Sequence, residues 1–374
     1  GIRDRSNPSW YLYNFRSSTI RRLLSKGYRV VCLAPEDTYS SKLVNELGCD
    51  WYAIQMVGAG KNPLDDMRVF FQLHRHYGRL RPTVALHFTI KPNIYGTLAA
   101  KSFGIPAINN VSGLGTSFLK RGPVSIIVRG LYRASQPYAH RVFCQNVDDL
   151  EFLRKTGLVP VDKLELLPGS GVDLCKFKPV EKRDRSGPFR FLFAGRMIAD
   201  KGLLELVDVV RRINSDGLRC VLWLSGFADV ENQSAITEAE LTAWSSEPGI
   251  VWLGHTDSME SLYAQVDCVV LPSYREGMPR SLLEACAMGV PVVSTRVPGC
   301  RYIVEHEYNG LLCEAKSRDS LEDVMRDMME SPREVRNKMG MNGRTIVEQS
   351  YDERLVIDAT LRAIEEAVID NRAG

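Results

Sequence analysis

One stretch of the chain combines residue types that suit a negatively charged ligand rich in hydroxyl groups. The apolar run Cys268–Leu271 predicts a strand, and residues 272–294 follow it with a loop that contains Glu276-Gly277-Met278, a helix and a second strand. Pro279 is expected in the first turn of this helix, and Gly289 is expected to end it. Amides at the start of a helix favour negative charge, and a glycine lets a ligand approach the backbone. Glu276 and Glu284 lie eight positions apart, and two carboxylates beside an anion are unfavourable unless ligand hydroxyls donate to them. A sugar nucleotide supplies both groups; the alternative is a helix cap with one surface glutamate.

A second stretch carries positive charge between a predicted strand and a predicted helix. It contains Gly195-Arg196 and Lys201-Gly202, with Arg196 and Lys201 five positions apart. The guanidinium can donate two hydrogen bonds to phosphate oxygens, and the ammonium adds a point charge. These side chains therefore predict a diphosphate site, unless each only pairs with a surface acid.

Both stretches resemble the retaining glycosyltransferase family 4. Residues 272–294 are similar to its E-x7-E signature, including the P-S-x-x-E-G-x-P opening and the G-x-P-V-V-S exit, and the resemblance extends from about Trp10 to the final helix. It implies an α/β chain of the GT-B class, with two Rossmann-like doubly wound parallel-sheet domains facing a cleft. It also implies roles for individual residues: Gly195, Arg196 and Lys201 at the donor diphosphate, Glu276 with the Gly277 and Met278 amides at the donor sugar, and Glu284 at the ribose.

The same resemblance implies catalytic and acceptor residues in the first half of the chain. His87 matches the family's active-site histidine after the fourth strand and is expected to contact the donor sugar, although a lone histidine is more often structural. The acceptor-side candidates are Asn14, Arg16, Lys91, Ser112 and Gly113. The catalytic set is His87, Glu276, Arg196 and Lys201.

The expected chemistry uses no metal and no cofactor beyond the sugar-nucleotide substrate. No Asp-x-Asp occurs in the chain, so Arg196, Lys201 and helix amides are expected to stabilise the leaving UDP. Glu276 and Glu284 are not interpreted as a glycosidase pair, whose carboxylates flank the scissile bond. The family implies retention by front-face attack, with a donor phosphate oxygen taking the acceptor proton.

The segments 11–16, 87–93 and 110–115 resemble the bacterial branch that extends undecaprenyl-diphosphate-linked sugars in surface-glycan and lipopolysaccharide assembly. Residues 1–178 carry 25 basic and 13 acidic side chains, which suggests contact with a polyanion or an anionic membrane surface. Phe118-Leu119-Lys120-Arg121 and the apolar residues from Val124 to Tyr132 can either lie on a membrane or pack inside the domain. A nucleic acid partner is not expected.

Composition places further bounds on the class of protein. The 374 residues suffice for two domains, and 44% of them are hydrophobic. Nine cysteines are scattered without a C-x-x-C, which favours a reducing compartment. No uncharged apolar run reaches the length of a membrane span, and the first residues do not resemble a signal peptide. We therefore expect a cytoplasmic protein, peripheral on the inner face of the membrane.

Alternating strand and helix patterns, with a helix at 94–103 among them, predict a parallel sheet in each half. The expected domains are 1–178 for the acceptor, 179–350 for the nucleotide sugar, and a C-terminal helix at 351–374 that packs back toward the first domain. A family member opens with a buried strand, whereas residues 2–8 are too polar for one, so the first strand of the family's sheet is expected to be missing here.

Together these features predict a retaining hexosyl- or N-acetylhexosaminyltransferase that uses a UDP-sugar and a polyprenyl-diphosphate-linked acceptor. A UDP-N-acetylglucosamine 2-epimerase and a catalytically impaired sugar-nucleotide-binding protein are the alternatives. The sequence does not specify the donor sugar or the linkage.

Overall fold

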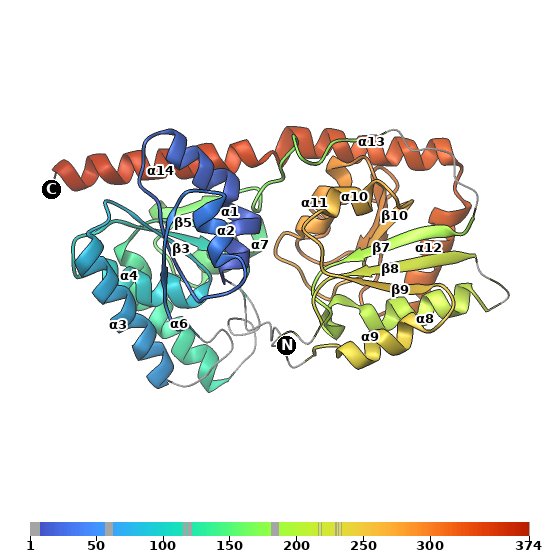
Figure 1. Cartoon of the computed structure of the whole chain (residues 1–374), viewed down its shortest axis with the longest axis horizontal. Coiled ribbons are helices and arrows are strands. Elements are labelled where there is room, and N and C mark those ends of the chain that lie inside the picture. Colours follow the sequence, from blue (N-terminus) through green and yellow to red (C-terminus); the bar gives the residue numbers. More distant parts are fainter. Residues whose placement is uncertain are drawn as a thin grey trace. The chain divides into compact units, whose positions relative to one another are not determined.

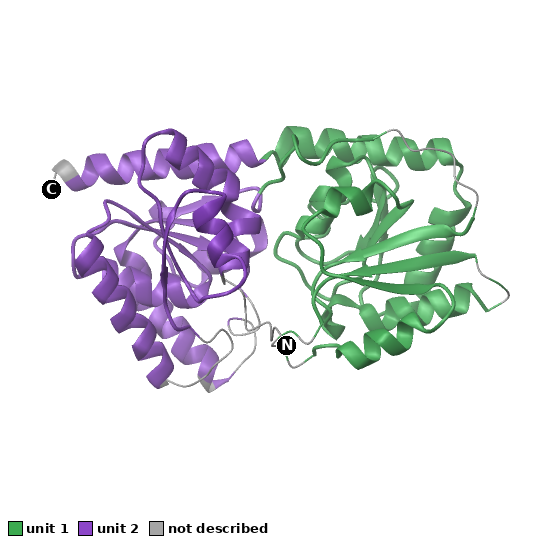
Figure 2. Cartoon of the chain, in the orientation of Figure 1, with its two compact units in different colours: residues 1–5, 171–352 green, residues 6–170, 353–374 purple. Residues whose placement is uncertain are grey.

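The chain folds into two compact units, shown in Figure 2. The computed structural model describes residues 8–56, 63–114, 118, 122–180, 187–215, 217, 219–228, 230, 232 and 234–373. Unit 1 contains the described residues from Gly171 to Asp352, and unit 2 contains those up to Ser170 together with those from Glu353 on. The expected boundaries were 178/179 and 350/351. Both units are α/β with parallel strands, as the fold class predicted.

The described part of unit 1 contains a six-stranded parallel sheet with the strand order β12-β11-β10-β7-β8-β9. Its strands carry continuous apolar runs because both faces of the sheet are covered by helices. Figure 1 shows α8 and α9 below this sheet and α10 and α11 above it. The strands are β7 (Phe189–Ala194), β8 (Cys220–Ser225), β9 (Ile250–Gly254), β10 (Cys268–Leu271), β11 (Val292–Thr295) and β12 (Gly310–Cys313). The helices are η4 (Ala199–Lys201), α8 (Leu203–Ile213), α9 (Glu238–Ser245), α10 (Met259–Tyr263), α11 (Arg280–Ala287), α12 (Arg318–Glu330) and α13 (Arg333–Ser350).

The strand order of unit 1 reverses at β7. The chain passes from β7 to β8 and β9 on one side, then crosses to β10 on the other side of β7. The loops that follow β7 and β10 therefore diverge from neighbouring strands at the carboxyl edge of the sheet. Ligands of open α/β sheets bind at such a reversal point.

The described part of unit 2 has two separate parallel sheets, one with the order β1-β2 and one with the order β3-β4-β5-β6. The sequence predicted a parallel sheet in this half that lacks the family's first strand. Of the polar stretch 2–8, only Pro8 is described, as the first residue of α1. The strands are β1 (Val31–Ala34), β2 (Asp50–Ala53), β3 (Ala85–Phe88), β4 (Ala107–Val111), β5 (Ala139–Cys144) and β6 (Leu164–Leu166).

The helices of unit 2 include a π-helical turn within the segment that was predicted as one helix over 94–103. The turn, η1, spans Pro92–Gly96 and continues into α4. A Cβ at Gly96 would lie 2.5 Å from His87 Nε2, so only glycine allows η1 to lie this close to β3. The helices are α1 (Pro8–Ser25), α2 (Ser40–Asn45), α3 (Pro63–Leu80), η1, α4 (Thr97–Lys101), α6 (Pro123–Ser135), η2 (Gln136–Tyr138), α7 (Val147–Lys155), η3 (Val161–Lys163) and α14 (Glu353–Ala373).

The C-terminal helix α14 packs on the core of unit 2. Val356, Leu361 and Ile364 join one buried cluster with Ile108 of β4 and Phe143 of β5. Two ion pairs add to this contact at the surface, Lys26 with Glu365 and Arg141 with Glu366. Burial of the apolar face supplies most of the stabilisation, because exposed ion pairs contribute little.

All nine cysteines are free, and eight of them are buried. They behave as small apolar side chains, as their positions in strand-like runs predicted. Within the described residues, no helix is both long enough and apolar enough to cross a bilayer.

Candidate functional site

The loop after β7 carries two cationic side chains: Arg196, which is exposed, and Lys201, which forms an ion pair. Arg196 is exposed, and its guanidinium forms no ion pair with any residue that the structure describes. Lys201 ends the short turn η4 and is followed by Gly202, whose φ of 74° is left-handed. A Cβ at Gly202 would lie 2.2 Å from the carbonyl oxygen of Pro272. Glycine is therefore required where this loop packs against the loop after β10.

The loop after β10 places Glu276 beside Lys201. Glu276 Oε1 accepts hydrogen bonds from Lys201 Nζ and, at 2.6 Å, from Ser273 Oγ. The side chains of Lys201 and Glu276 are 16% and 9% exposed, so this ion pair is largely shielded from water. A backbone hydrogen bond of 3.0 Å from Tyr274 to Asp200 also joins the two loops. The predicted phosphate-binding lysine and the predicted sugar-binding glutamate thus meet at the reversal point of the sheet.

The helix α11 begins at Arg280, with Pro279 as its N-cap rather than its first helical residue. Glu284 lies on this helix and is 8% exposed. Its two carboxylate oxygens are already bound, one by Arg280 Nε at 2.7 Å and one by Tyr263 Oη at 3.0 Å. Burial and the neighbouring Glu284 carboxylate raise the pKa of Tyr263 well above its usual range. A ribose hydroxyl at Glu284 must therefore share the carboxylate with these two partners.

Gly277 and Met278 complete the loop before α11. The left-handed residue Gly299 packs against this loop, where a Cβ would lie 2.6 Å from the carbonyl oxygen of Gly277. Met278 packs partly against the apolar core of unit 1. These two packing contacts fix the backbone of the loop.

In unit 2, Arg16 is a buried cation on α1. It is 4% exposed, and its guanidinium carbon lies 4.7 Å from the ring centroid of Phe88, the last residue of β3. Its Nη2 donates to Tyr11 Oη at 2.9 Å, whereas its Nε has no hydrogen-bond partner within the described part of the chain. Across the described ranges, no carboxylate pairs with Arg16. Asn14, on the same helix, donates to the Trp10 carbonyl oxygen at 3.2 Å.

His87 lies inside unit 2 and is 3% exposed. Both ring nitrogens have partners: Nε2 with Tyr77 Oη at 2.7 Å, and Nδ1 with Asn109 Oδ1 at 2.8 Å. The network continues from Asn109 to Thr97 and Gln136. This geometry leaves no ring nitrogen for the predicted contact with a donor sugar. It fits a structural role instead, the alternative that applies to most lone histidines.

His87 is expected to make the stability of the protein depend on pH. Burial lowers the pKa of His87 from 6.5 to about 4, partly offset by the bond to Asn109. The folded protein holds His87 uncharged, whereas the unfolded chain binds a proton at this residue below pH 6.5. The free energy of unfolding is therefore highest above pH 6.5 and decreases as the pH falls toward 4. A shift of this size corresponds to about 3 kcal/mol. Urea unfolding over this pH range should show the loss.

The variant His87→Gln should flatten this component of the pH dependence. His306→Gln, at an exposed position of unit 1, provides the matched control. An unchanged slope in the His87 variant would contradict the assignment.

The remaining acceptor candidates lie at the carboxyl ends of β3 and β4. Lys91 forms an ion pair of 2.9 Å with Asp66 of α3, which also accepts a hydrogen bond from Tyr95. Ser112 and Gly113 follow β4 directly, and both line a small cavity there. The ion pair with Asp66 holds the Lys91 side chain against α3, whereas Ser112 and Gly113 line the cavity.

The sequence did not predict the residues that form hydrogen bonds with the expected site residues. Ser273 lies three positions before Glu276, and Arg280 lies four positions before Glu284, the spacing of helical neighbours. Those two contacts had a local signal. Tyr263 and Tyr77 had none, because they reach their partners through the tertiary fold.

No metal ligand set emerges from the geometry. Among the residues that are described, the structure has no group of three or more His, Cys, Asp or Glu side chains placed to hold a metal ion.

Comparison with known proteins identifies the class of enzyme. Residues 176–346 match the family Glycosyl transferases group 1. The chain is 27% identical to the N,N'-diacetylbacillosaminyl-diphospho-undecaprenol alpha-1,3-N-acetylgalactosaminyltransferase of Campylobacter jejuni, over 96% of each chain. It is 26% identical to the UDP-Gal:alpha-D-GlcNAc-diphosphoundecaprenol alpha-1,3-galactosyltransferase of Escherichia coli, over 69% of each chain.

Solved structures agree on the fold. Sucrose-phosphate synthase from Thermosynechococcus elongatus superposes with a TM-score of 0.78 at 17% identity, covering 93% of this chain and 91% of the other. Anabaena HepE in complex with UDP-glucose superposes with a TM-score of 0.74 at 17% identity, covering 93% of this chain and 95% of the other. The chain is therefore a glycosyltransferase with the GT-B fold, and its residues 176–346 form a Glycosyl transferases group 1 domain.

Proposed function

We propose that this glycosyltransferase moves a hexose or N-acetylhexosamine from a UDP-sugar to a polyprenyl-diphosphate-linked saccharide, with retention of configuration. The observation that carries the proposal is the group of Arg196, Lys201 and Glu276 at the reversal point of the unit 1 sheet. Two cations suit a diphosphate, and a held carboxylate suits sugar hydroxyls. The names of the Campylobacter jejuni and Escherichia coli relatives support an undecaprenyl-diphosphate-linked acceptor.

In the proposed donor complex, Arg196 and Lys201 bind the diphosphate and stabilise the UDP that leaves. The backbone of Gly195, Gly277 and Met278 lines the same site, and the N-terminus of α11 adds its positive dipole. Glu276 accepts hydrogen bonds from the donor sugar, and Glu284 from the ribose. His87 acts only as a positioning residue, because its two nitrogens bind Tyr77 and Asn109.

The proposed transfer needs no catalytic carboxylate. The bond between the anomeric carbon and the UDP oxygen breaks, and the acceptor oxygen forms the new bond on the same face. The acceptor proton passes to an oxygen of the departing diphosphate. Fixed cations contribute most to such a reaction, because they stabilise negative charge as it develops without reorganising. Activity in excess chelator is the result that this route requires.

Unit 2 is the proposed acceptor side. Arg16 supplies a buried cation for the lipid-linked diphosphate, and Ser112 and Gly113 line a small cavity at the carboxyl end of β4. Asn14 and Lys91 are proposed to stabilise the acceptor side rather than to bind the acceptor directly. Asn14 donates to the Trp10 carbonyl oxygen, and Lys91 forms an ion pair with Asp66. The excess of basic residues in the first half of the chain suits a diphosphate at a membrane surface.

We further propose that the first turns of α6 contact an anionic bilayer at the inner face of the cytoplasmic membrane. Ile126 is 73% exposed and Ile127 is 60% exposed, while Tyr132 and Phe118 are buried in the core. Some apolar residues of this segment therefore pack inside the domain, and others are exposed and could contact a membrane, the two roles that the sequence left open. Residues 119–121 of the predicted basic segment lie outside the described residues.

The double variant Ile126→Gln/Ile127→Gln should bind vesicles at least about tenfold more weakly, because two isoleucines lose apolar burial. Co-sedimentation with vesicles that contain anionic lipid measures this. Val161→Gln is the control, since Val161 is equally exposed on η3 but lies before β6, at the amino edge of the sheet. Equal binding by all three proteins would refute the membrane contact.

The function is tested by measuring UDP release from a panel of UDP-sugars, with and without a polyprenyl-diphosphate-linked sugar in detergent. Release that requires one donor and the lipid acceptor supports the proposal. A product that is an epimerised sugar nucleotide, formed without acceptor, would assign the chain to the epimerases. Binding of UDP without turnover of any donor would indicate a sugar-nucleotide-binding protein.

A further inference from the structure

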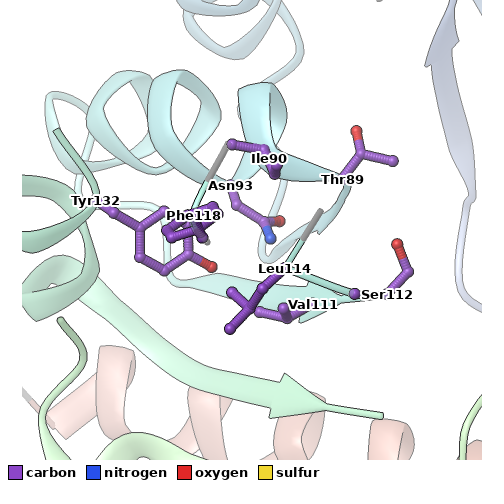
Figure 3. A pocket seen from close by; sticks show the side chains of 9 residues that line it. Thr89, Ile90, Asn93, Val111, Ser112, Leu114, Phe118 and Tyr132 are labelled. Atoms are coloured by element: carbon purple, nitrogen blue, oxygen red, sulfur yellow. The ribbon is translucent and has the colours of Figure 1, made fainter. Parts of the chain in front are cut away.

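Unit 2 contains a small cavity at the carboxyl ends of β3 and β4 (Figure 3). Tyr132 and Phe118 form one side of it, and Thr89 and Ser112 lie on the other. Its volume is about 10 Å³, close to what a single water molecule needs. The lining residues are Thr89, Ile90, Asn93, Val111, Ser112, Gly113, Leu114, Phe118 and Tyr132.

Two buried polar atoms of this lining have no hydrogen-bond partner among the residues that the structure describes. They are Asn93 Oδ1 and Tyr132 Oη, on side chains that are each 1% exposed. A buried polar group without a partner is costly, so an occupant that satisfies both atoms would gain this free energy. The cavity is therefore shaped for a polar guest.

The two atoms define the chemistry of that guest. Asn93 Nδ2 donates to the Asn110 carbonyl oxygen at 3.0 Å, which assigns Oδ1 as the remaining polar atom of the side chain, an acceptor. Burial raises the pKa of Tyr132, with a partial offset from nearby Asn93, so the phenol keeps its proton and can donate. The guest must donate to Asn93 and accept from Tyr132. A hydroxyl group does both, whereas a carbonyl or a carboxylate cannot donate.

One of the residues that line the cavity has a strained backbone. Thr89 has a φ of 72°, in the left-handed region that a β-branched residue rarely adopts. Such strain persists where the surrounding structure enforces it and is common at ligand sites. Thr89 directly follows Phe88, over whose ring the Arg16 guanidinium lies. The cavity and the buried cation are thus joined by consecutive residues of one strand end.

We propose that this cavity is a subsite for one hydroxyl group of the acceptor saccharide, read by Asn93 and Tyr132. The inference rests on the proposed function, and it assigns to these two residues the recognition of one position on the acceptor sugar. Arg16 binds the diphosphate, and the subsite fixes the sugar that carries it.

The test compares wild type with Tyr132→Phe on a short-chain polyprenyl diphosphate that carries an N-acetylhexosamine, and on its monodeoxy analogues. Tyr132→Phe should lower kcat/KM for the intact acceptor about tenfold, the size of one hydrogen bond to a buried group. One monodeoxy analogue should show the same loss with wild type and no further loss with Tyr132→Phe. The thermal stability of the unliganded variant should change little, because the phenol hydroxyl has only the neighbouring Asn93 side chain near it and no hydrogen-bond partner among the described residues.

Tyr138→Phe is the matched control, because it removes a phenol hydroxyl from an exposed ring of the same unit. It should leave kcat/KM unchanged. If Tyr132→Phe lowers stability and leaves the acceptor kinetics intact, the cavity holds a structural water and the subsite is refuted. Additive losses for every analogue would also refute it. If wild type transfers to no acceptor, the proposed function itself fails, and the subsite falls with it.

Discussion

Replacing Lys201 by methionine is expected to lower kcat/KM for the UDP-sugar by about 100- to 1,000-fold, the usual effect of removing one fixed group that stabilises developing charge. Lys201 is held beside Glu276 at the point where the loops after β7 and β10 meet. Arg196 would remain, but it is exposed and forms no ion pair with the described residues. A flexible cation replaces a fixed one poorly, so the effect should fall mainly on kcat.

The same substitution is expected to destabilise the protein, by on the order of 3 kcal/mol, because it leaves the Glu276 carboxylate shielded from water without its cation. Lys201→Met/Glu276→Gln should recover most of that stability while transfer stays impaired. Lys338→Met, at an exposed site on α13, controls for loss of a positive charge from the unit. Steady-state kinetics and urea unfolding on all four proteins separate the two effects. If the double variant regains activity together with stability, Lys201 serves the fold and not the reaction.

The loops around this site were predictable because their signals are local. The strand Cys268–Leu271 was predicted with the bounds that β10 has, and Gly289 follows α11 with a left-handed φ of 68°, as expected of a helix end. Pro279 was expected inside the helix and is its N-cap, a difference of one residue. Proline and glycine restrict the backbone by their own covalent structure, so their effect can be inferred without the fold.

The partners of the site residues were not predictable in the same way. Tyr263 lies on α10 and reaches Glu284 of α11 only because β10 brings the two helices together. The burial of His87 depends on Tyr77 of α3 and Asn109 of β4, which are distant in sequence. A sequence pattern shows that a histidine ends a strand, but not whether its two nitrogens are already bound.

The architecture of unit 2 shows the same limit. The alternation of strands and helices predicted a parallel fold, and both sheets are parallel. The division of the strands into the sheets β1-β2 and β3-β4-β5-β6 depends on which strands form hydrogen bonds with each other, and the composition of a single strand does not indicate its partner. The π-helical turn at Pro92–Gly96 was also missed, since its apolar spacing resembles that of an α-helix.

Arg16→Met is expected to raise the melting temperature of the unliganded protein and to weaken binding of the lipid-linked diphosphate about 100-fold. The guanidinium is 4% exposed, and over the described part of the chain it has no carboxylate to neutralise it. Replacing a buried charge by an apolar side chain of similar length is often stabilising by about 1–3 kcal/mol. Loss of the contacts with Phe88 and Tyr11 offsets part of that gain.

The two expected effects have opposite signs, which distinguishes an anion site from a structural arginine. Thermal unfolding with and without inorganic pyrophosphate measures both: pyrophosphate should raise the melting temperature of wild type by more than that of Arg16→Met, which keeps only the proposed donor site at Arg196 and Lys201. Arg22→Met, at an exposed position on the same helix, should behave like wild type. A structural arginine would instead show a lower melting temperature on substitution, together with equal protection of both proteins by pyrophosphate. The contacts with Phe88 and Tyr11 supply no negative charge, so protection that decreases on loss of Arg16 would mark this position as the diphosphate site of the acceptor.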